Sequence, residues 1–116
     1  AVSGGFHEIL DPLAERLGLD EWRANRLEVS DGTLTGRVLG PIIDGQAKAD
    51  ALIEWVTSYG IHARDTVAVG DGANDLLMMR EAGTSIAFCA KPVVAEQANV
   101  VITVRDMTEI LASVLS

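Results

Sequence analysis

The chain has 116 residues, of which 48% are apolar and 22% charged, enough for one domain with a modest core. Its net charge of −8 argues against nucleic acid and anionic membranes as partners, so any phosphate site has to be built locally. No apolar run approaches the roughly 20 residues that span a bilayer, and we find no leader pattern, so we expect neither a membrane span nor secretion. With a single cysteine, Cys89, which cannot form an internal disulfide, these features predict a cytoplasmic protein.

The first residues are typical of the end of a strand that turns into a helix. Ser3–Gly5 brings a hydroxyl and free backbone N–H groups to the start of that helix, an arrangement that receives a phosphate. An ordinary N-cap explains the same residues at least as well. Apolar residues then recur at helical spacing up to Leu17, and Gly18 is expected to end the helix. Pro12 interrupts the pattern, so the helix either kinks there or starts afresh with Asp11 as its cap.

The next two elements are a hairpin and a second helix. Residues 26–39 alternate around Asp31-Gly32, which predicts an inserted β-hairpin. The following helix is expected from about Gly45 to Tyr59, with Asp44 at its entrance. Lys48 lies early in this helix. A lone lysine on a helix usually faces solvent, but this one stands in chain order between a serine turn and an aspartate turn.

The second half of the chain alternates between strand and helix patterns. Strands are expected near residues 66–70, 85–89 and 100–104, and helices near 74–82, 92–98 and 107–115. Such alternation implies right-handed crossovers and a parallel sheet covered by helices. The sequence therefore predicts an α/β fold, a Rossmann-like three-layer arrangement around a parallel sheet.

The run Gly70–Asp75, Gly-Asp-Gly-Ala-Asn-Asp, follows the first of these strands. Ligands of open α/β sheets bind at the carboxyl ends of the strands, where the glycines allow a sharp turn. Asp71 and Asp75 are four residues apart around that turn, and paired carboxylates suit Mg²⁺. Asn74 adds a neutral donor and acceptor. The alternative is a solvated turn in which Asp75 caps the next helix.

The order of these motifs resembles that of the haloacid-dehalogenase-like phosphatases, and within them of the phosphoserine phosphatase family. Val2–Phe6 is similar to the second motif of that superfamily, Lys48 to the third and Gly70–Asp75 to the fourth. The narrower resemblance depends on Val2–Phe6 together with Ala24–Glu28 and Ile86–Pro92.

The resemblance covers essentially residues 1–116 and implies the C-terminal part of a single haloacid-dehalogenase-like core domain. The first motif of the superfamily, Asp-x-Asp-x-Thr/Ser, does not occur in the sequence, and the helical cap that grips the substrate is not found either. The missing strand would lie between those ending at Val2 and Val69. We therefore expect an unpaired edge along residues 66–70, covered by the missing N-terminal part of the protein or by a second copy, which makes a homo-oligomer an open alternative.

The resemblance also implies a reaction and a role for each motif. The reaction is Mg²⁺-dependent hydrolysis of L-phosphoserine to L-serine and phosphate, the last step of serine biosynthesis, through an aspartyl-phosphate whose aspartate lies upstream. The implied ligands of Mg²⁺ are Asp71 and Asp75, with Asp75 often acting through water. Ser3 and the Gly4 N–H would bind the phosphoryl oxygens, Lys48 would neutralise them, and Asn74 would complete the shell.

Two alternatives to this function remain at the level of the sequence. The chain could belong to a non-catalytic phosphate- or metal-binding module, or to a phosphatase for another small phosphomonoester such as a sugar or homoserine phosphate.

Overall fold

The computed structural model describes residues 1–40 and 42–115. Its strands and helices are β1 (Val2–Phe6), α1 (His7–Leu17), β2 (Arg23–Ser30), β3 (Thr33–Leu39), α2 (Gly45–Tyr59), β4 (Val67–Gly70), α3 (Leu76–Glu81), β5 (Thr84–Phe88), α4 (Pro92–Ala95), β6 (Val100–Ile102) and α5 (Thr108–Leu115), with single 3-10 turns at Ala63–Asp65 and Ala73–Asp75.

The strands form two separate three-stranded sheets in the described part of the chain, in the orders β1-β2-β3 and β4-β5-β6. In the second sheet all pairs are parallel, with Val67 opposite Thr84 and Ile86 opposite Val100. In the first sheet β1 and β2 are parallel, whereas β2 and β3 form the predicted antiparallel hairpin. The hairpin is therefore not a detached insertion, because its first strand also extends the sheet that begins with β1.

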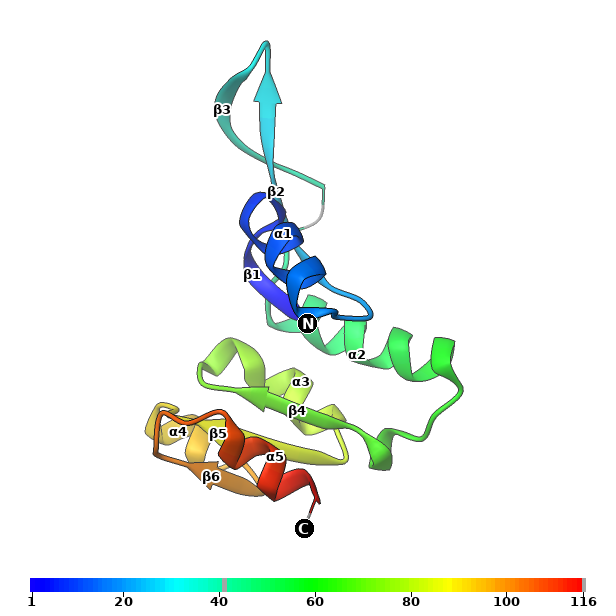
Figure 1. The fold of residues 1–116 in the computed structure, drawn as a ribbon, viewed down its shortest axis with the longest axis vertical. Helices are drawn as coiled ribbons and strands as arrows, with labels where there is room; N and C mark the ends of the chain where they lie inside the picture. The colour runs from blue at the N-terminus through cyan, green and yellow to red at the C-terminus, as the bar shows by residue number, and fades with distance from the viewer. Residues whose placement is uncertain (41, 116) are drawn as a thin grey trace.

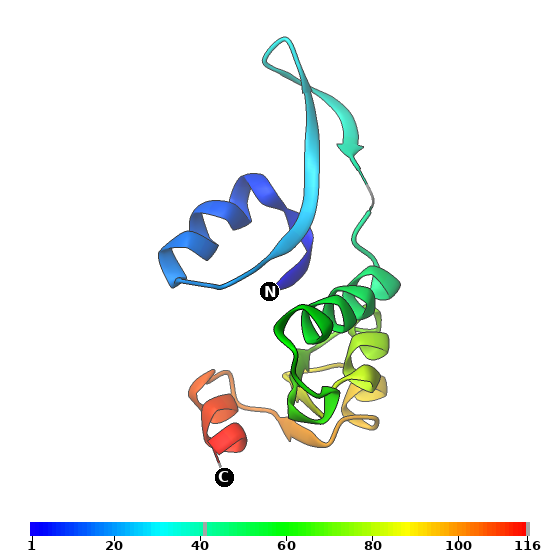
Figure 2. The same ribbon diagram turned by 90° about the vertical axis from the view of Figure 1, so that its right-hand side faces the viewer.

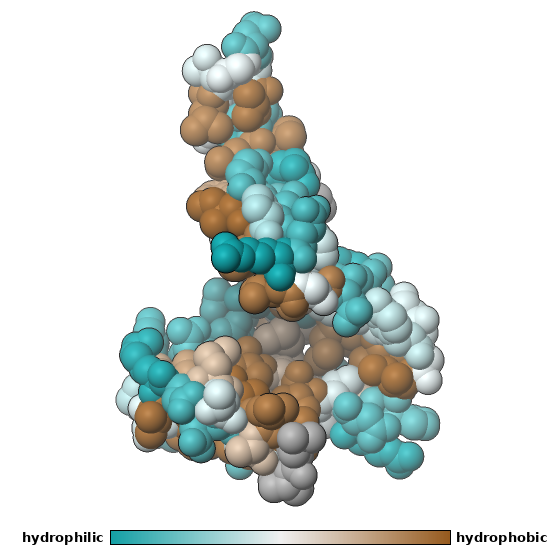
Figure 3. Space-filling model, viewed as in Figure 1, coloured by the Kyte–Doolittle hydropathy of each residue, from teal (hydrophilic) through white to brown (hydrophobic). Residues whose placement is uncertain are grey.

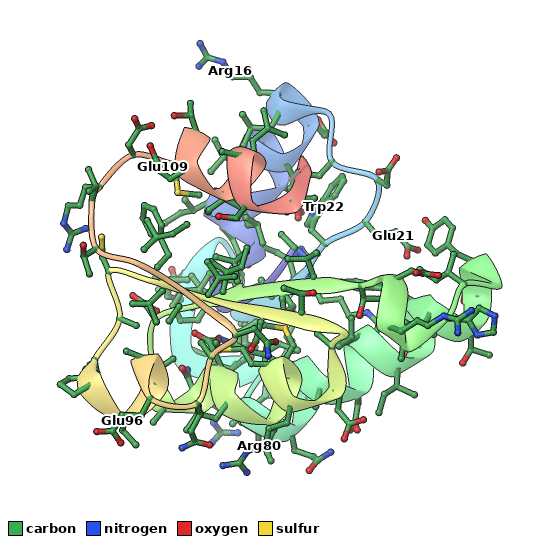
Figure 4. All side chains as sticks on the ribbon, turned by 90° about the horizontal axis from the view of Figure 1, so that it is seen from below. Arg16, Glu21, Trp22, Arg80, Glu96 and Glu109 are labelled. Carbon is green, nitrogen blue, oxygen red and sulfur yellow. The ribbon has the colours of Figure 1, made fainter. Side chains whose placement is uncertain are left out.

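Helices cover both faces of the strands. In Figure 2, α2, α3 and α4 lie on one side and α1 and α5 on the other. Figure 4 shows the same division, with Arg80 and Glu96 on the side of α3 and α4, and Arg16 and Glu109 on the opposite side. The predicted α/β class, with its parallel sheet between two layers of helices, is confirmed.

The C-terminus of α1 and the N-terminus of α2 lie where the sequence predicts them. Helix α1 runs through Pro12 without a restart and ends at Gly18, whose φ of 70° is the left-handed conformation that glycine adopts readily. The entrance of α2 is capped by Asp44, whose carboxylate accepts a 2.9 Å hydrogen bond from the Ala47 N–H.

The structure corrects two local expectations at the start of the chain. Ser3–Gly5 lies inside strand β1 and not at the mouth of a helix, because α1 begins only at His7. The N-cap interpretation is also wrong, since Phe6 occupies that position and makes no side-chain cap bond. Strand β1 pairs with β2 at Val2 and Phe6, and the register shifts between these two pairs, so Ser3–Gly5 form an irregular stretch within the strand.

The molecule exposes more surface than a compact protein of its size. Its accessible area is 7,624 Å², whereas a compact monomer of this mass exposes about 6,100 Å². Its radius of gyration is 15.4 Å, against about 13 Å for a compact domain of this length. The β2–β3 hairpin projects from the body in Figure 1, and apolar side chains lie on the visible surface of the hairpin and of the body below it in Figure 3.

A groove separates the two sheets. Strand β1 is an edge strand of one sheet and β4 is an edge strand of the other. One edge of each of these two strands therefore has no partner strand among the described residues. The expected open edge at residues 66–70 is thus confirmed for β4, where Val67 and Val69 are exposed. A cavity of about 320 Å³ between them is lined mainly by apolar residues: Ala1, Val2, Leu52, Trp55, Val67, Ala68, Val69 and Met78.

No helix in the described residues is long and apolar enough to cross a membrane.

Candidate phosphate and metal site

A second cavity, of about 300 Å³, lies at the end of this groove, where β1 and β4 approach the first turns of α2. It is lined by Val2, Ser3, Lys48, Val69, Gly70, Asp71, Asp75 and Phe88. Four of the six residues that the sequence singled out, those at positions 3, 48, 71 and 75, therefore meet in one place. They come from three segments that are far apart in the sequence.

The other two predicted residues lie beside this cavity and do not line it. Gly4 follows Ser3 in β1, and its carbonyl accepts a hydrogen bond from the Asn25 side chain. Asn74 lies in the 3-10 turn before Asp75, with its side chain exposed.

The centre of the site is a buried ion pair. The Lys48 ammonium lies 2.7 Å from Oδ1 of Asp75, and each side chain is only 9% exposed. The other carboxylate oxygen, Oδ2, accepts hydrogen bonds from the backbone N–H groups of Asp71 at 3.1 Å and Gly72 at 3.3 Å. Burial raises the pKa of Asp75, but Lys48 and the two N–H groups outweigh it and hold that pKa below its usual range.

Asp75 therefore closes its own turn and does not cap the following helix. Helix α3 has no side-chain bond from Asp75 at its entrance. The turn is also sterically tight, because a Cβ at Gly70 would stand 2.5 Å from the Cβ of Asp75. Glycine at position 70 is what allows the carboxylate to fold back toward Lys48.

Asp71 is the accessible carboxylate of the site. Its side chain is exposed at the cavity, and no group in the described part of the chain donates a hydrogen bond to it. Its backbone carbonyl is held by the Lys91 N–H at 3.1 Å, which ties the turn to the loop after β5.

The oxygen donors of Asp71 and Asp75 are compatible with Mg²⁺. Asp71 offers a free carboxylate, whereas Asp75 has three of its approximately four acceptor positions occupied and suits a metal-bound water better than the metal itself. Among the described residues no group of three or more histidine, cysteine or acidic side chains gathers as a metal site. Mg²⁺ needs only one or two protein carboxylates when water and phosphate supply its remaining ligands.

Ser3 is oriented as a hydrogen-bond donor. Its Oγ accepts the Gly5 N–H at 2.9 Å, so one lone pair is occupied and the hydroxyl hydrogen is left for another acceptor. A phosphoryl oxygen in the cavity would be such an acceptor.

A neighbouring polar network has a structural role. Nδ1 of His7 lies 2.6 Å from the Asp11 carboxylate, to which Trp22 also donates a hydrogen bond, at 2.8 Å. The other ring nitrogen of His7 accepts the Ala24 N–H at 3.2 Å. Nε2 of His7 thus joins α1 to β2, whereas Nδ1 pairs with Asp11 inside α1, and Asp11 serves this network and caps no helix.

One residue in contact with the site was given no role from the sequence. Asn25 is buried and bonded to both the Gly4 carbonyl and the Ile43 N–H. Its position in an alternating strand carries no local signal, because the partners are 21 and 18 residues away.

Comparison with known proteins places this geometry in a family. The model of the haloacid dehalogenase-like hydrolases matches residues 2–80, a range that includes both sides of the cavity. The chain belongs to the haloacid dehalogenase-like hydrolase family. Within this family it is 49% identical over 110 residues to the phosphoserine phosphatase of Streptococcus thermophilus, covering 95% of this chain and 51% of that protein.

Solved structures of the same family agree. A probable phosphoserine phosphatase from Vibrio cholerae, in its unliganded form, superimposes with a TM-score of 0.94 at 41% identity and covers 98% of this chain and 35% of that one. A phosphoserine phosphatase solved as an analogue of its phospho-aspartyl intermediate gives a TM-score of 0.91 at 50% identity, with coverages of 97% and 54%. The chain spans about half the length of several curated relatives that it matches and only about a quarter of others.

Proposed function

We propose that this chain is part of a longer Mg²⁺-dependent phosphatase that converts L-phosphoserine to L-serine and phosphate, the last step of serine biosynthesis. The observation that carries the proposal is the meeting of a serine hydroxyl, a lysine and two aspartates in one cavity of about 300 Å³. The substrate is inferred from relatives that are named phosphoserine phosphatases and are about half identical to this chain. We call this chain joined to its proposed N-terminal part the whole protein.

Each residue of the cavity has a role in this proposal. Ser3 donates its hydroxyl hydrogen to a phosphoryl oxygen, and the Gly4 N–H and the Asn74 amide add further donors at the edge of the site. Lys48 neutralises charge on the phosphoryl group while it remains paired with Asp75. Asp71, with Asp75 through a water, would hold Mg²⁺, which when bound offsets charge on the phosphoryl oxygens.

The nucleophile in this proposal is an aspartate outside the chain. Both aspartates that line the cavity already have roles in holding the metal, and Asp75 is occupied by three hydrogen bonds. The external carboxylate forms a bond to phosphorus as the bond between phosphorus and the serine oxygen breaks, and the second aspartate of the same external motif gives the leaving oxygen its proton. Water then cleaves the aspartyl-phosphate and releases phosphate. A relative captured as a phospho-aspartyl analogue supports this order of events.

Phosphate release from L-phosphoserine tests the function. We expect the whole protein to release phosphate with Mg²⁺, and both its Asp71→Asn variant and this chain alone to release none. Release by this chain alone would show that the nucleophile is assigned wrongly. Phosphate release from a different phosphomonoester, such as a sugar phosphate, and not from L-phosphoserine would show that the substrate is assigned wrongly. No phosphate release from any of these compounds would favour a non-catalytic binding module.

The same proposal assigns a partner to the groove between β1 and β4. Neither strand edge has a partner strand among the described residues, the groove is apolar, and the molecule exposes roughly a quarter more area than a compact protein of its mass. We propose that one strand from the N-terminal part fills it and pairs with both edges.

Co-expression of the two parts as separate chains tests this assignment. We expect them to co-elute as a one-to-one complex in size-exclusion chromatography, and this chain alone to self-associate. The assignment would be refuted if this chain is a folded monomer that does not bind the N-terminal part.

A further inference from the structure

Asn25 links the two segments that carry the phosphate-binding groups. Its side chain comes from β2 and is almost fully buried, with 7% of the residue exposed. The amide nitrogen donates a 3.0 Å hydrogen bond to the Gly4 carbonyl in β1. The amide oxygen accepts a 2.7 Å hydrogen bond from the Ile43 N–H, just before helix α2. One side chain therefore joins β1 to the entrance of α2.

The first of these bonds determines how Ser3 is presented. The peptide group between Gly4 and Gly5 is planar, so holding its carbonyl toward Asn25 also sets the direction of its N–H. That N–H donates to Oγ of Ser3 at 2.9 Å. With two glycines the backbone is unusually free to rotate, so an external bond is needed to keep this peptide in one orientation. The Ser3 hydroxyl hydrogen remains available to the cavity only in that orientation.

The second bond determines where Lys48 stands. Ile43 directly precedes Asp44, whose side chain caps α2 through the Ala47 N–H and whose carbonyl accepts the Lys48 N–H at 3.0 Å. Fixing the backbone at residue 43 thus fixes the first turn of α2, and with it the lysine that reaches Asp75.

We propose that Asn25 is a positioning residue that sets the Ser3 hydroxyl and the Lys48 ammonium at the right separation to hold one phosphoryl group. This inference rests on the proposed phosphatase function and names a determinant of that site. Asn25 itself does not line the cavity, so it acts through Ser3 and Lys48 and not by touching the phosphate.

Substitution of Asn25 by Asp in the whole protein separates this role from ordinary stabilisation. The replacement has the same shape and still accepts the Ile43 N–H, but its carboxylate cannot donate to the Gly4 carbonyl. Asn25→Ser is a second, smaller variant that is too short to reach that carbonyl and keeps the test available where the aspartate prevents folding.

Thr66→Val provides the matched control. Thr66 is 8% exposed, and its hydroxyl also bridges two segments, donating to the Ala63 carbonyl at 2.6 Å and accepting the Gly83 N–H at 3.1 Å. It lies before β4, at the end of the strand opposite to the cavity, so its loss should affect stability alone.

The measurements are kcat and KM for L-phosphoserine, the inhibition constant of orthophosphate, and the thermal midpoint of each variant. We expect Asn25→Asp to lower kcat/KM and the affinity for orthophosphate by about tenfold or more, as expected for one misdirected hydrogen bond to a charged group. Thr66→Val should lower the thermal midpoint while both constants stay within about twofold. In a double variant with Ser3→Ala, the loss should be smaller than the product of the single losses, because both act through the same hydroxyl.

Three results are decisive. Weakened orthophosphate inhibition and non-additivity with Ser3→Ala support the positioning role. Asn25 variants that change only the thermal midpoint, like Thr66→Val, overturn that role and leave the phosphatase intact. If the wild-type whole protein neither hydrolyses phosphoserine nor binds orthophosphate, the proposed function is wrong, and the positioning role of Asn25 is then wrong too.

Discussion

Replacing Lys48 by Met should destabilise the protein by about 3–5 kcal/mol, because it leaves the Asp75 carboxylate buried without its cation. The two charges are 2.7 Å apart with each side chain 9% exposed, so solvent screens them little. At an effective dielectric constant of about 20, such a pair attracts by about 6 kcal/mol. Asp75 retains its bonds from the Asp71 and Gly72 N–H groups, which offset part of the loss.

Urea unfolding of the whole protein, followed by fluorescence of its tryptophans, measures this effect. With a denaturant slope of about 2 kcal/mol per molar, the midpoint should fall by roughly 2 M. The matched control is Lys91→Met, the same substitution at an exposed lysine whose side chain forms no hydrogen bond or ion pair with the described residues. This control should change stability by no more than about 0.5 kcal/mol.

A double-mutant cycle isolates the pair itself. Asp75→Asn alone removes the charge that Lys48 neutralises, and the double variant should lose less than the sum of the two single losses. The reasoning is refuted if Lys48→Met shifts the midpoint no further than Lys91→Met does, or if the two single losses add.

Three further predictions concern the same turn. Gly70→Ala should displace the Asp75 side chain, since the new methyl group would stand 2.5 Å from its Cβ; we expect a loss of both stability and phosphate release, and retention of full activity would contradict the tight turn. Asp71→Asn should leave the urea midpoint almost unchanged, because this exposed carboxylate accepts no hydrogen bond from the described residues, yet abolish the response to added Mg²⁺; an unchanged Mg²⁺ titration would remove Asp71 from the metal site. The pKa of Asp75 is held below its ordinary value of 3.8 in the folded state, so the stability that this shift provides is complete above about pH 5 and is lost as the pH falls through the folded-state pKa. Unfolding measured between pH 6 and pH 2 should therefore show a steeper acid loss in the wild type than in Asp75→Asn, and parallel curves would refute this attribution.

Features that depend on local chemistry could be predicted from the sequence. Helix α2 has the predicted bounds because Asp44 supplies a cap and Gly60 a left-handed end, both encoded within the segment. The hairpin follows from Asp31-Gly32, both of which adopt the positive φ that a two-residue turn needs. The order of strands and helices in the second half follows from the apolar period, and the accessible carboxylate of Asp71 follows from its place after a strand.

Features that depend on partners distant in the sequence became visible only in the folded chain. Pairing of β1 with β2 on both sides of Ser3–Gly5, at Val2 and Phe6, makes these residues an irregular stretch of a strand, although the glycines suggest a turn. Lys48 and Asp75 are 27 residues apart, and only the packing of α2 against the 3-10 turn shows that Asp75 is occupied by the lysine. The role of Asn25 was hidden for the same reason. A buried amide is satisfied by whichever backbone groups the fold brings to it, and no spacing within the strand records which groups those are.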